Sequence, residues 1–150
     1  MLTCSGAIVS QTLSCLQAGG ADNCETVVLW LGRRSKGDQV VVEVFRPQQN
    51  VDVDLFHIPP EGMRSLLAHL RDRRLQILAQ VHSHPRLAFH SKADDEWAIV
   101  RHLGAISIVI PWFAARTTTS SLLRDAAAFE LDDNNEWKQV PAGTVVKVQN

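Results

Sequence analysis

Three observations predict an α/β fold from this sequence. Short apolar runs over residues 26–31, 75–81 and 105–110 have the length of buried strands. A stretch with helical periodicity, residues 60–74, lies between the first two of them. With 150 residues, of which 45% are hydrophobic and 21% charged, the chain has the size and composition of one soluble globular domain, residues 1–150.

The N-terminal part is expected to form a short helix followed by a β-hairpin. Residues 5–18 carry apolar side chains at helical spacing, and Gly19-Gly20 ends the pattern. The strands Thr26–Leu31 and Val40–Phe45 flank a charged turn that contains glycine, which indicates an antiparallel pair. The cations of that turn are interpreted as a solvated hairpin tip, with a patch for an acidic partner as the alternative: Arg33, Arg34 and Lys36.

The middle of the chain is predicted to pass from an irregular stretch through a helix into a strand. Residues 47–60 show no periodicity, and Pro60 suits a first helical turn. Apolar residues then follow at the spacing of an amphipathic helix: Met63, Leu66, Leu67 and Leu70. This helix leads into the strand Leu75–Val81. Open α/β sheets tend to present their chemistry at the carboxyl end of such a strand.

Two histidines close that strand. Side chains two residues apart on a strand point to the same side, so His82 and His84 can face one cation. Ser91 and Asp94 follow after a loop of six residues. Two imidazoles and a carboxylate form a catalytic zinc set, because they leave a fourth tetrahedral position for water.

Each part of this motif also has a plainer interpretation. A single His-x-His is more often the polar end of a strand than a metal site. Ser91, three residues before an acid and at the start of an apolar pattern, resembles a helix-capping box, in which the third position is normally Glu or Gln. The two interpretations are compatible, because a capped helix start also fixes the direction of Asp94. The combination of paired histidines, a short loop and an acid at a helix start favours the metal site.

The C-terminal third is expected to contain a helix, a strand and a hairpin. The helix is predicted over Ala93–His102 and ends at Gly104, and a strand covered on both faces follows over Ala105–Ile110. Trp112 and Phe113 are either core residues or an exposed ledge for substrate. A polar loop then leads to a closing hairpin with the strands Ala126–Leu131 and Trp137–Val140.

Composition argues against several classes of protein. A net charge of −1 gives no electrostatic case for binding nucleic acid or a membrane surface. No apolar run approaches the ~20 residues of a membrane helix, and the first residues lack the pattern of a secretion signal. The odd number of cysteines, 3, without a Cys-x-x-Cys pair favours neither a disulfide framework nor a cysteine zinc site. A reducing cytoplasm is the expected location.

The sequence His-Ser-His-Pro followed by Ser-x-x-Asp resembles the signature of the JAMM (MPN-plus) zinc metalloproteases. The likeness runs from Cys24 to Pro111 and implies that three side chains bind Zn²⁺: His82, His84 and Asp94. It implies a catalytic role for Ser91 beside the attacking water. The family also has a catalytic Glu on an early strand, and Glu25, followed by an apolar strand and Gly32, has the expected spacing.

One departure and one competing acid accompany this resemblance. The loop between His84 and Ser91 has six residues, one fewer than is usual in the family, so its contacts should differ. Glu43 on the second strand competes with Glu25 for the role of general base, and the spacing to Gly32 favours Glu25. Two further histidines are not expected to be ligands: His90 and His102.

The resemblance implies an MPN-like curved mixed sheet and the hydrolysis of an amide. The expected substrate is an isopeptide or peptide bond at the C-terminus of a ubiquitin-like protein, because the chain resembles a bacterial subgroup found with ubiquitin-like conjugation enzymes. Expected partners are that protein, its conjugates and the activating and conjugating enzymes. A peptidase that trims a sulfur-carrier protein and a non-catalytic MPN scaffold are the alternatives. Substrate contacts are expected from three residues: Leu87, Phe89 and Trp112.

Overall fold

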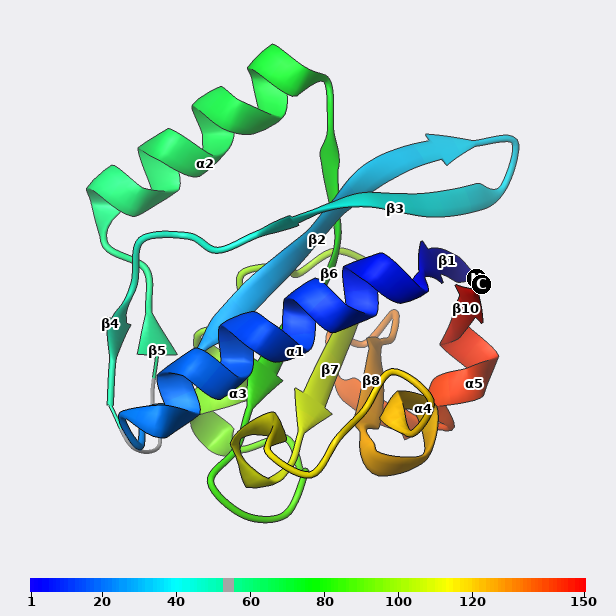
Figure 1. Cartoon of the computed structure of the whole chain (residues 1–150). Coiled ribbons are helices and arrows are strands. Elements are labelled where there is room, and N and C mark those ends of the chain that lie inside the picture. The colour runs from blue at the N-terminus through cyan, green and yellow to red at the C-terminus, as the bar shows by residue number, and fades with distance from the viewer. Residues whose placement is uncertain (53–55) are drawn as a thin grey trace.

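The fold is a mixed eight-stranded sheet with helices on both faces, as the sequence predicts (Figure 1). The computed structural model describes residues 1–52 and 56–150. The strand order of the sheet is β10-β1-β3-β2-β6-β7-β8-β9. Its strands are β1 (Leu2–Ser5), β2 (Val27–Ser35), β3 (Asp38–Phe45), β6 (Gln76–Ser83), β7 (Ile106–Ile110), β8 (Ala127–Leu131), β9 (Trp137–Val140) and β10 (Val146–Gln149).

The central strand β2 supplies both halves of the core, because alternate side chains point to opposite faces. One face packs against helix α1 (Gly6–Ala21), with Val28 and Trp30 among the buried residues of that cluster. The buried indole N–H of Trp30 donates to Thr12 Oγ1 of α1 at 2.8 Å. The other face, with Leu29, packs against helix α2 (Pro60–Arg73) through Leu66. Figure 1 shows the two long helices on either side of β2.

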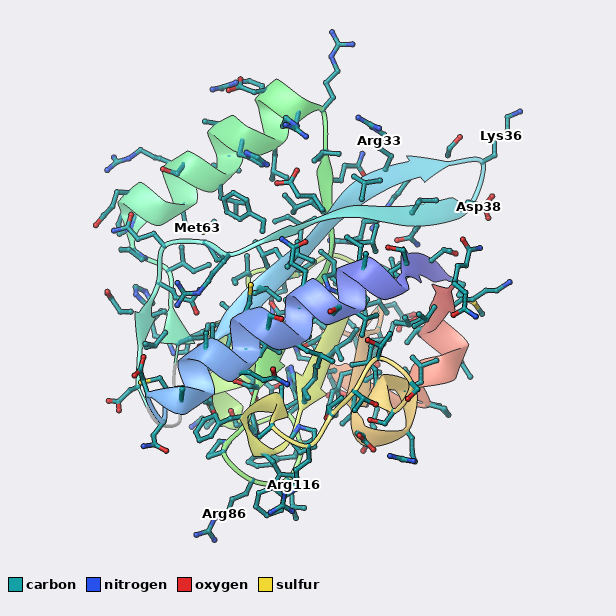
Figure 2. The ribbon with its side chains drawn as sticks, viewed as in Figure 1. Arg33, Lys36, Asp38, Met63, Arg86 and Arg116 are labelled. Carbon is teal, nitrogen blue, oxygen red and sulfur yellow. The ribbon has the colours of Figure 1, made fainter. Side chains whose placement is uncertain are left out.

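The hairpin β2–β3 is antiparallel, as predicted, and it is longer than the apolar pattern indicates. Figure 2 shows Arg33, Lys36 and Asp38 at its outer end, away from the body of the protein. The residues of this tip are exposed. The arrangement agrees with a solvated hairpin tip.

Two strands at the edge of the sheet were not predicted. β1 pairs in parallel with β10, with Leu2 opposite Val146, and also with β3. Both strands are only four residues long. Their pairing joins the two ends of the sequence, and no local pattern records such a contact.

The predicted helix over Ala93–His102 is wrong in its second half, because α3 (Lys92–Glu96) ends at Glu96. The cause lies on the neighbouring strand. The buried side chain of Gln80 accepts hydrogen bonds from the backbone N–H groups of Ile99 at 2.8 Å and Val100 at 3.4 Å. The backbone there is thus held by β6 instead of by a further helical turn.

The remaining segments are short. The stretch 47–60, predicted to be irregular, contains a small antiparallel pair of β4 (Asn50–Val51) and β5 (Phe56–His57), while residues 53–55 lie outside the described residues. After β7 come the turn η1 (Trp112–Ala114), α4 (Leu122–Asp125) and, before β10, α5 (Ala142–Val145). In the part of the chain that the structure describes, no helix has the length and apolar character needed to cross a bilayer.

The buried thiol of Cys4 on β1 makes stability sensitive to alkaline pH. Burial raises its pKa from 9.0 to about 11. An unfolded chain therefore releases this proton from about pH 9, whereas the folded chain keeps it until about pH 11, so stability falls as the pH rises through this window. We expect Cys4→Ala to lose less stability than the unchanged chain between about pH 8 and about pH 10.5, measured by urea unfolding. An equal loss in both proteins would contradict this prediction.

Candidate active site

The pairing of β2 with β6 brings two distant parts of the sequence together. The strands are antiparallel, with Val27 opposite His82. Beyond this pair, the Ser83 N–H donates to the Thr26 carbonyl at 3.1 Å. Continuing the register by one residue places Glu25 next to His84, and Glu25 Oε1 lies 3.8 Å from His84 Nε2.

Three side chains converge at the carboxyl end of β6. His84 Nε2 lies 3.1 Å from Asp94 Oδ2, and His82 Nε2 lies 3.2 Å from Asp94 Oδ1. One ligand atom from each residue falls within 4.8 Å of the others, and all three residues are buried. The two histidines and Asp94 therefore face a common point. Two imidazoles and one carboxylate are a donor set that suits a divalent transition metal such as zinc.

The hydrogen bonding of His82 supports a cation at this point. Its side chain is 0% exposed, yet within the described residues neither ring nitrogen has a partner with hydrogen-bond geometry. Buried polar atoms are normally satisfied, so such an orphan calls for an explanation. A metal ion between the three side chains would satisfy one of the two nitrogens.

The protonation states of His82 and Asp94 suit metal binding as well. Burial lowers the pKa of His82 despite the nearby Asp94 carboxylate, which keeps the imidazole in its neutral, ligating form. Burial also acts on His84, but hydrogen bonding to Asp94 and the charge of Glu25 outweigh it and raise the pKa of His84. Asp94 is buried too, but its two histidine neighbours hold its pKa far below the usual range, so the carboxylate is ionised.

The capping box predicted at Ser91 is present and orients Asp94. The Asp94 N–H donates to Ser91 Oγ at 3.1 Å, and the Ser91 N–H donates back to Asp94 Oδ2 at 2.8 Å. One carboxylate oxygen thus accepts from the cap while both oxygens face the histidines. The plainer interpretation of Ser91 is therefore correct, and it also serves the site.

A strained turn holds the backbone of His84. Its N–H donates to the Ile110 carbonyl at 2.9 Å, and its carbonyl accepts from the Phe113 N–H at 2.8 Å. Phe113 and its two neighbours in η1 have positive φ values: Trp112 57°, Phe113 50° and Ala114 60°. Each such non-glycine residue costs on the order of 1–2 kcal/mol. Strain of this kind persists where the surrounding structure fixes the backbone, here directly beside a candidate ligand.

Comparison with known proteins gives the family. Residues 16–122 match the model of the prokaryotic homologs of the JAB domain. A protein of Sinorhizobium fredii (strain NBRC 101917 / NGR234), named "Probable metalloprotease y4jG", is 31% identical over 144 residues, which are 93% of this chain and 87% of that protein. This chain belongs to the prokaryotic JAB family. The family model, the named relative and the buried His-His-Asp set all indicate a metalloprotease of the JAB/JAMM type. The resemblance noted in the sequence is thereby confirmed.

Two solution structures share the fold. A protein of Desulfitobacterium hafniense superimposes with a TM-score of 0.69 at 18% identity, over 99% of this chain and 93% of the other. A protein of Salinibacter ruber (strain DSM 13855) gives 0.62 at 18% identity, over 93% of this chain and 88% of the other. These likenesses show that the fold occurs in both proteins.

The residues predicted to contact substrate border the JAB-family site. The Phe89 ring, 54% exposed, meets the His84 ring edge to face with centroids 4.6 Å apart. Leu87 is 69% exposed on the same loop. Trp112 is half-buried, donates its N–H to the Arg86 carbonyl at 2.9 Å, and is covered by the Arg116 guanidinium 4.1 Å from its ring centroid. Substrate contacts by these residues stay a prediction.

The structure also places the competing acid and the two histidines that were not expected to be ligands. The competing acid Glu43 lies 2.5 Å from His69 Nε2 on α2, and so it is not part of the His-His-Asp cluster. His102 contacts Arg34 at 2.8 Å and lies outside the cluster as well. His90 is near it, with its ring centroid 6.3 Å from that of His82, but is not one of the three converging residues.

Sequence reasoning missed two residues that support the site. Phe56 of β5 packs its ring against His82 with centroids 5.3 Å apart. Gln80 anchors the chain after α3 from a fully buried position. Gln80 could have been noticed as one of two polar residues, with Gln76, inside the otherwise apolar run Leu75–Val81. Phe56 carries no such signal, because its contact depends on the fold of a stretch without periodicity.

Proposed function

We propose that this chain is a zinc metalloprotease that hydrolyses an isopeptide or peptide bond at the C-terminus of a ubiquitin-like protein, in a bacterial ubiquitin-like conjugation pathway. The observation that carries the proposal is the buried set of His82, His84 and Asp94 with Glu25 beside it. When bound there, Zn²⁺ supplies Lewis acidity, which lowers the pKa of water and polarises an amide carbonyl.

The other residues have roles that follow from their positions. Glu25, adjacent to His84, takes a proton from the attacking water and returns it to the leaving amine. Ser91, at the start of α3, donates its hydroxyl to that water or to the oxyanion that forms as the carbonyl is attacked. His84 is kept in place through both its backbone hydrogen bonds, so the geometry is fixed before substrate arrives.

The surface next to the site favours an extended, small-residue tail as substrate. The loop 85–90 exposes the apolar side chains of Leu87 and Phe89, and Figure 2 shows its arginine, Arg86, pointing away from the body. A pocket of about 220 Å³ lies between β5, the start of α2 and the end of α3, and Phe56 both lines it and contacts His82. Apolar surroundings accept a Gly-rich tail better than a charged segment.

Two matched fusions test this substrate. One carries a complete bacterial ubiquitin-like protein, and the other carries only its last few residues, each joined to the same reporter. We expect a higher kcat/KM for the complete protein, because the folded body adds contacts that the tail lacks. A bulky residue just before the scissile bond is expected to slow cleavage by about tenfold or more. Equal kcat/KM for both fusions, or fast cleavage after the bulky residue, would show that neither feature governs specificity.

A further inference from the structure

A chain of hydrogen bonds runs from the exposed Asp95 to the buried Gln80 beside the proposed metal site, without including any of its ligands. His90, whose side chain is 5% exposed, has Nδ1 2.5 Å from Asp95 Oδ1 and Nε2 3.2 Å from Ser107 Oγ. Ser107 Oγ also lies 3.1 Å from Gln80 Nε2. His90 ends the loop 85–90, Asp95 lies on α3, Ser107 on β7 and Gln80 on β6. They join the elements that surround the site.

The direction of these hydrogen bonds is fixed from one end. Gln80 Oε1 accepts from two backbone N–H groups, so its amide nitrogen faces Ser107 and donates to Oγ. The Ser107 hydroxyl can then donate to His90 Nε2, which leaves His90 Nδ1–H to donate to the Asp95 carboxylate. Each polar atom of the His90 ring therefore has a partner in one consistent arrangement.

Packing holds the same ring in place. The His90 ring lies 4.8 Å from that of Phe129 and 5.0 Å from that of Trp137, between centroids. These aromatic residues come from β8 and β9. The imidazole is thus fixed by the sheet on one side and by Asp95 on the other, and side-chain rotation would break contacts with both.

His90 and Asp95 stand on either side of the capping box. His90 directly precedes Ser91, whose N–H donates to Asp94 Oδ2, and Asp95 directly follows Asp94. The hydrogen bond between His90 and Asp95 therefore closes a loop of six residues around Ser91 and Asp94.

We propose that His90 is a positioning residue of the active site, which fixes Ser91 and the Asp94 carboxylate through Asp95 on α3 and Ser107 on the sheet. Both of its ring nitrogens are engaged in these contacts, so it neither binds the metal nor touches the substrate. The proposal rests on the proposed function, since it assigns a role toward the same metal site. Groups that hydrogen-bond a metal ligand directly typically change metal affinity or activity by about 10–100-fold, and His90, which acts through Asp95, is expected at the lower end of that range.

The test compares His90→Phe with His90→Asn and with His102→Phe as a matched control. Phe keeps an aromatic ring between Phe129 and Trp137 but removes both hydrogen bonds. Asn can place its amide N–H near the position of Nδ1 and can still donate to Asp95. Four quantities are measured: the Tm of the metal-free protein, the Zn²⁺ dissociation constant by chelator competition, the visible spectrum of the Co²⁺ form, and kcat and KM on the ubiquitin-like fusion.

We expect His90→Phe to weaken Zn²⁺ binding about tenfold, to change the Co²⁺ spectrum and to lower kcat with little change in KM, at a nearly unchanged Tm. His90→Asn should recover part of each loss, and His102→Phe should alter none of them. Unchanged Zn²⁺ affinity and Co²⁺ spectrum in His90→Phe would overturn the proposal. If the unchanged chain itself neither binds Zn²⁺ nor cleaves the fusion, the metalloprotease function fails instead.

A second pair of variants decides the matter if metal-free His90→Phe does not fold. Asp95 is 52% exposed, so its replacement should be tolerated. Asp95→Ala and Asp95→Asn remove the same charge, but only Asn can still accept a hydrogen bond from His90. We expect Asp95→Ala to bind Zn²⁺ several-fold more weakly than Asp95→Asn does. Equal affinities would overturn the proposal, because the contact with His90 would then contribute nothing to the site.

Discussion

Replacing His82 or Asp94 with alanine is expected to remove most of the metal and nearly all activity. The unchanged protein, purified without chelator, should carry close to one zinc per chain. Each replacement removes one of three donors that converge within 4.8 Å. Loss of one ligand from a three-ligand site should lower zinc content about tenfold or more, and turnover should fall in parallel because the Lewis acid is lost. Metal content is measured by elemental analysis and turnover on the ubiquitin-like fusion.

The control for these variants replaces a histidine that lies outside the proposed metal site. His102→Ala changes a histidine that contacts Arg34 and lies outside the converging set, and this variant should keep both zinc and activity. Circular dichroism of each variant reports whether the fold survives. Stoichiometric zinc in a protein with both His82 and His84 replaced by alanine would contradict the proposed metal site.

Local patterns were sufficient where an element is stabilised by its own residues. The apolar stripe after Pro60 predicts α2, which spans Pro60–Arg73, because Leu66 of that stripe is buried and Met63 and Leu70 pack against the same core cluster, whereas Leu67 is 57% exposed. The same holds for the strand β7, Ile106–Ile110, which is apolar except for Ser107 and is buried along its full length. The candidate metal ligands could also be predicted from the sequence, since both histidines and Asp94 lie in one short stretch.

Features that depend on distant partners were not predictable in this way. The pairing of β1 with β10 joins opposite ends of the chain, and α3 ends early because Gln80 captures two backbone N–H groups. Glu25 is an intermediate case. Its position beside His84 comes from the register of β2 against β6, which no local pattern encodes, and it was found through the spacing of a family motif.

The role of Glu25 gives the second large expected effect. Glu25→Gln should lower kcat roughly 10²–10⁴-fold, the range typical for the loss of a general base, while zinc stays bound. The zinc should remain because the three converging ligands are unchanged, and Glu25 lies next to His84 without belonging to that set. Kinetics on the fusion and metal analysis of the same sample measure both parts of the prediction.

Glu43→Ala is the matched control for Glu25→Gln. Glu43 is an acid on the adjacent strand β3, and it lies 2.5 Å from His69 and 3.8 Å from Arg73 on α2. Its removal should cost a modest amount of stability through those contacts and leave kcat within a few-fold, because exposed and half-buried ion pairs contribute about 1 kcal/mol or less. An inactive Glu43→Ala beside an active Glu25→Gln would transfer the role of base to Glu43. Zinc lost from Glu25→Gln would instead make Glu25 a ligand, since a general base can be neutralised without releasing the metal.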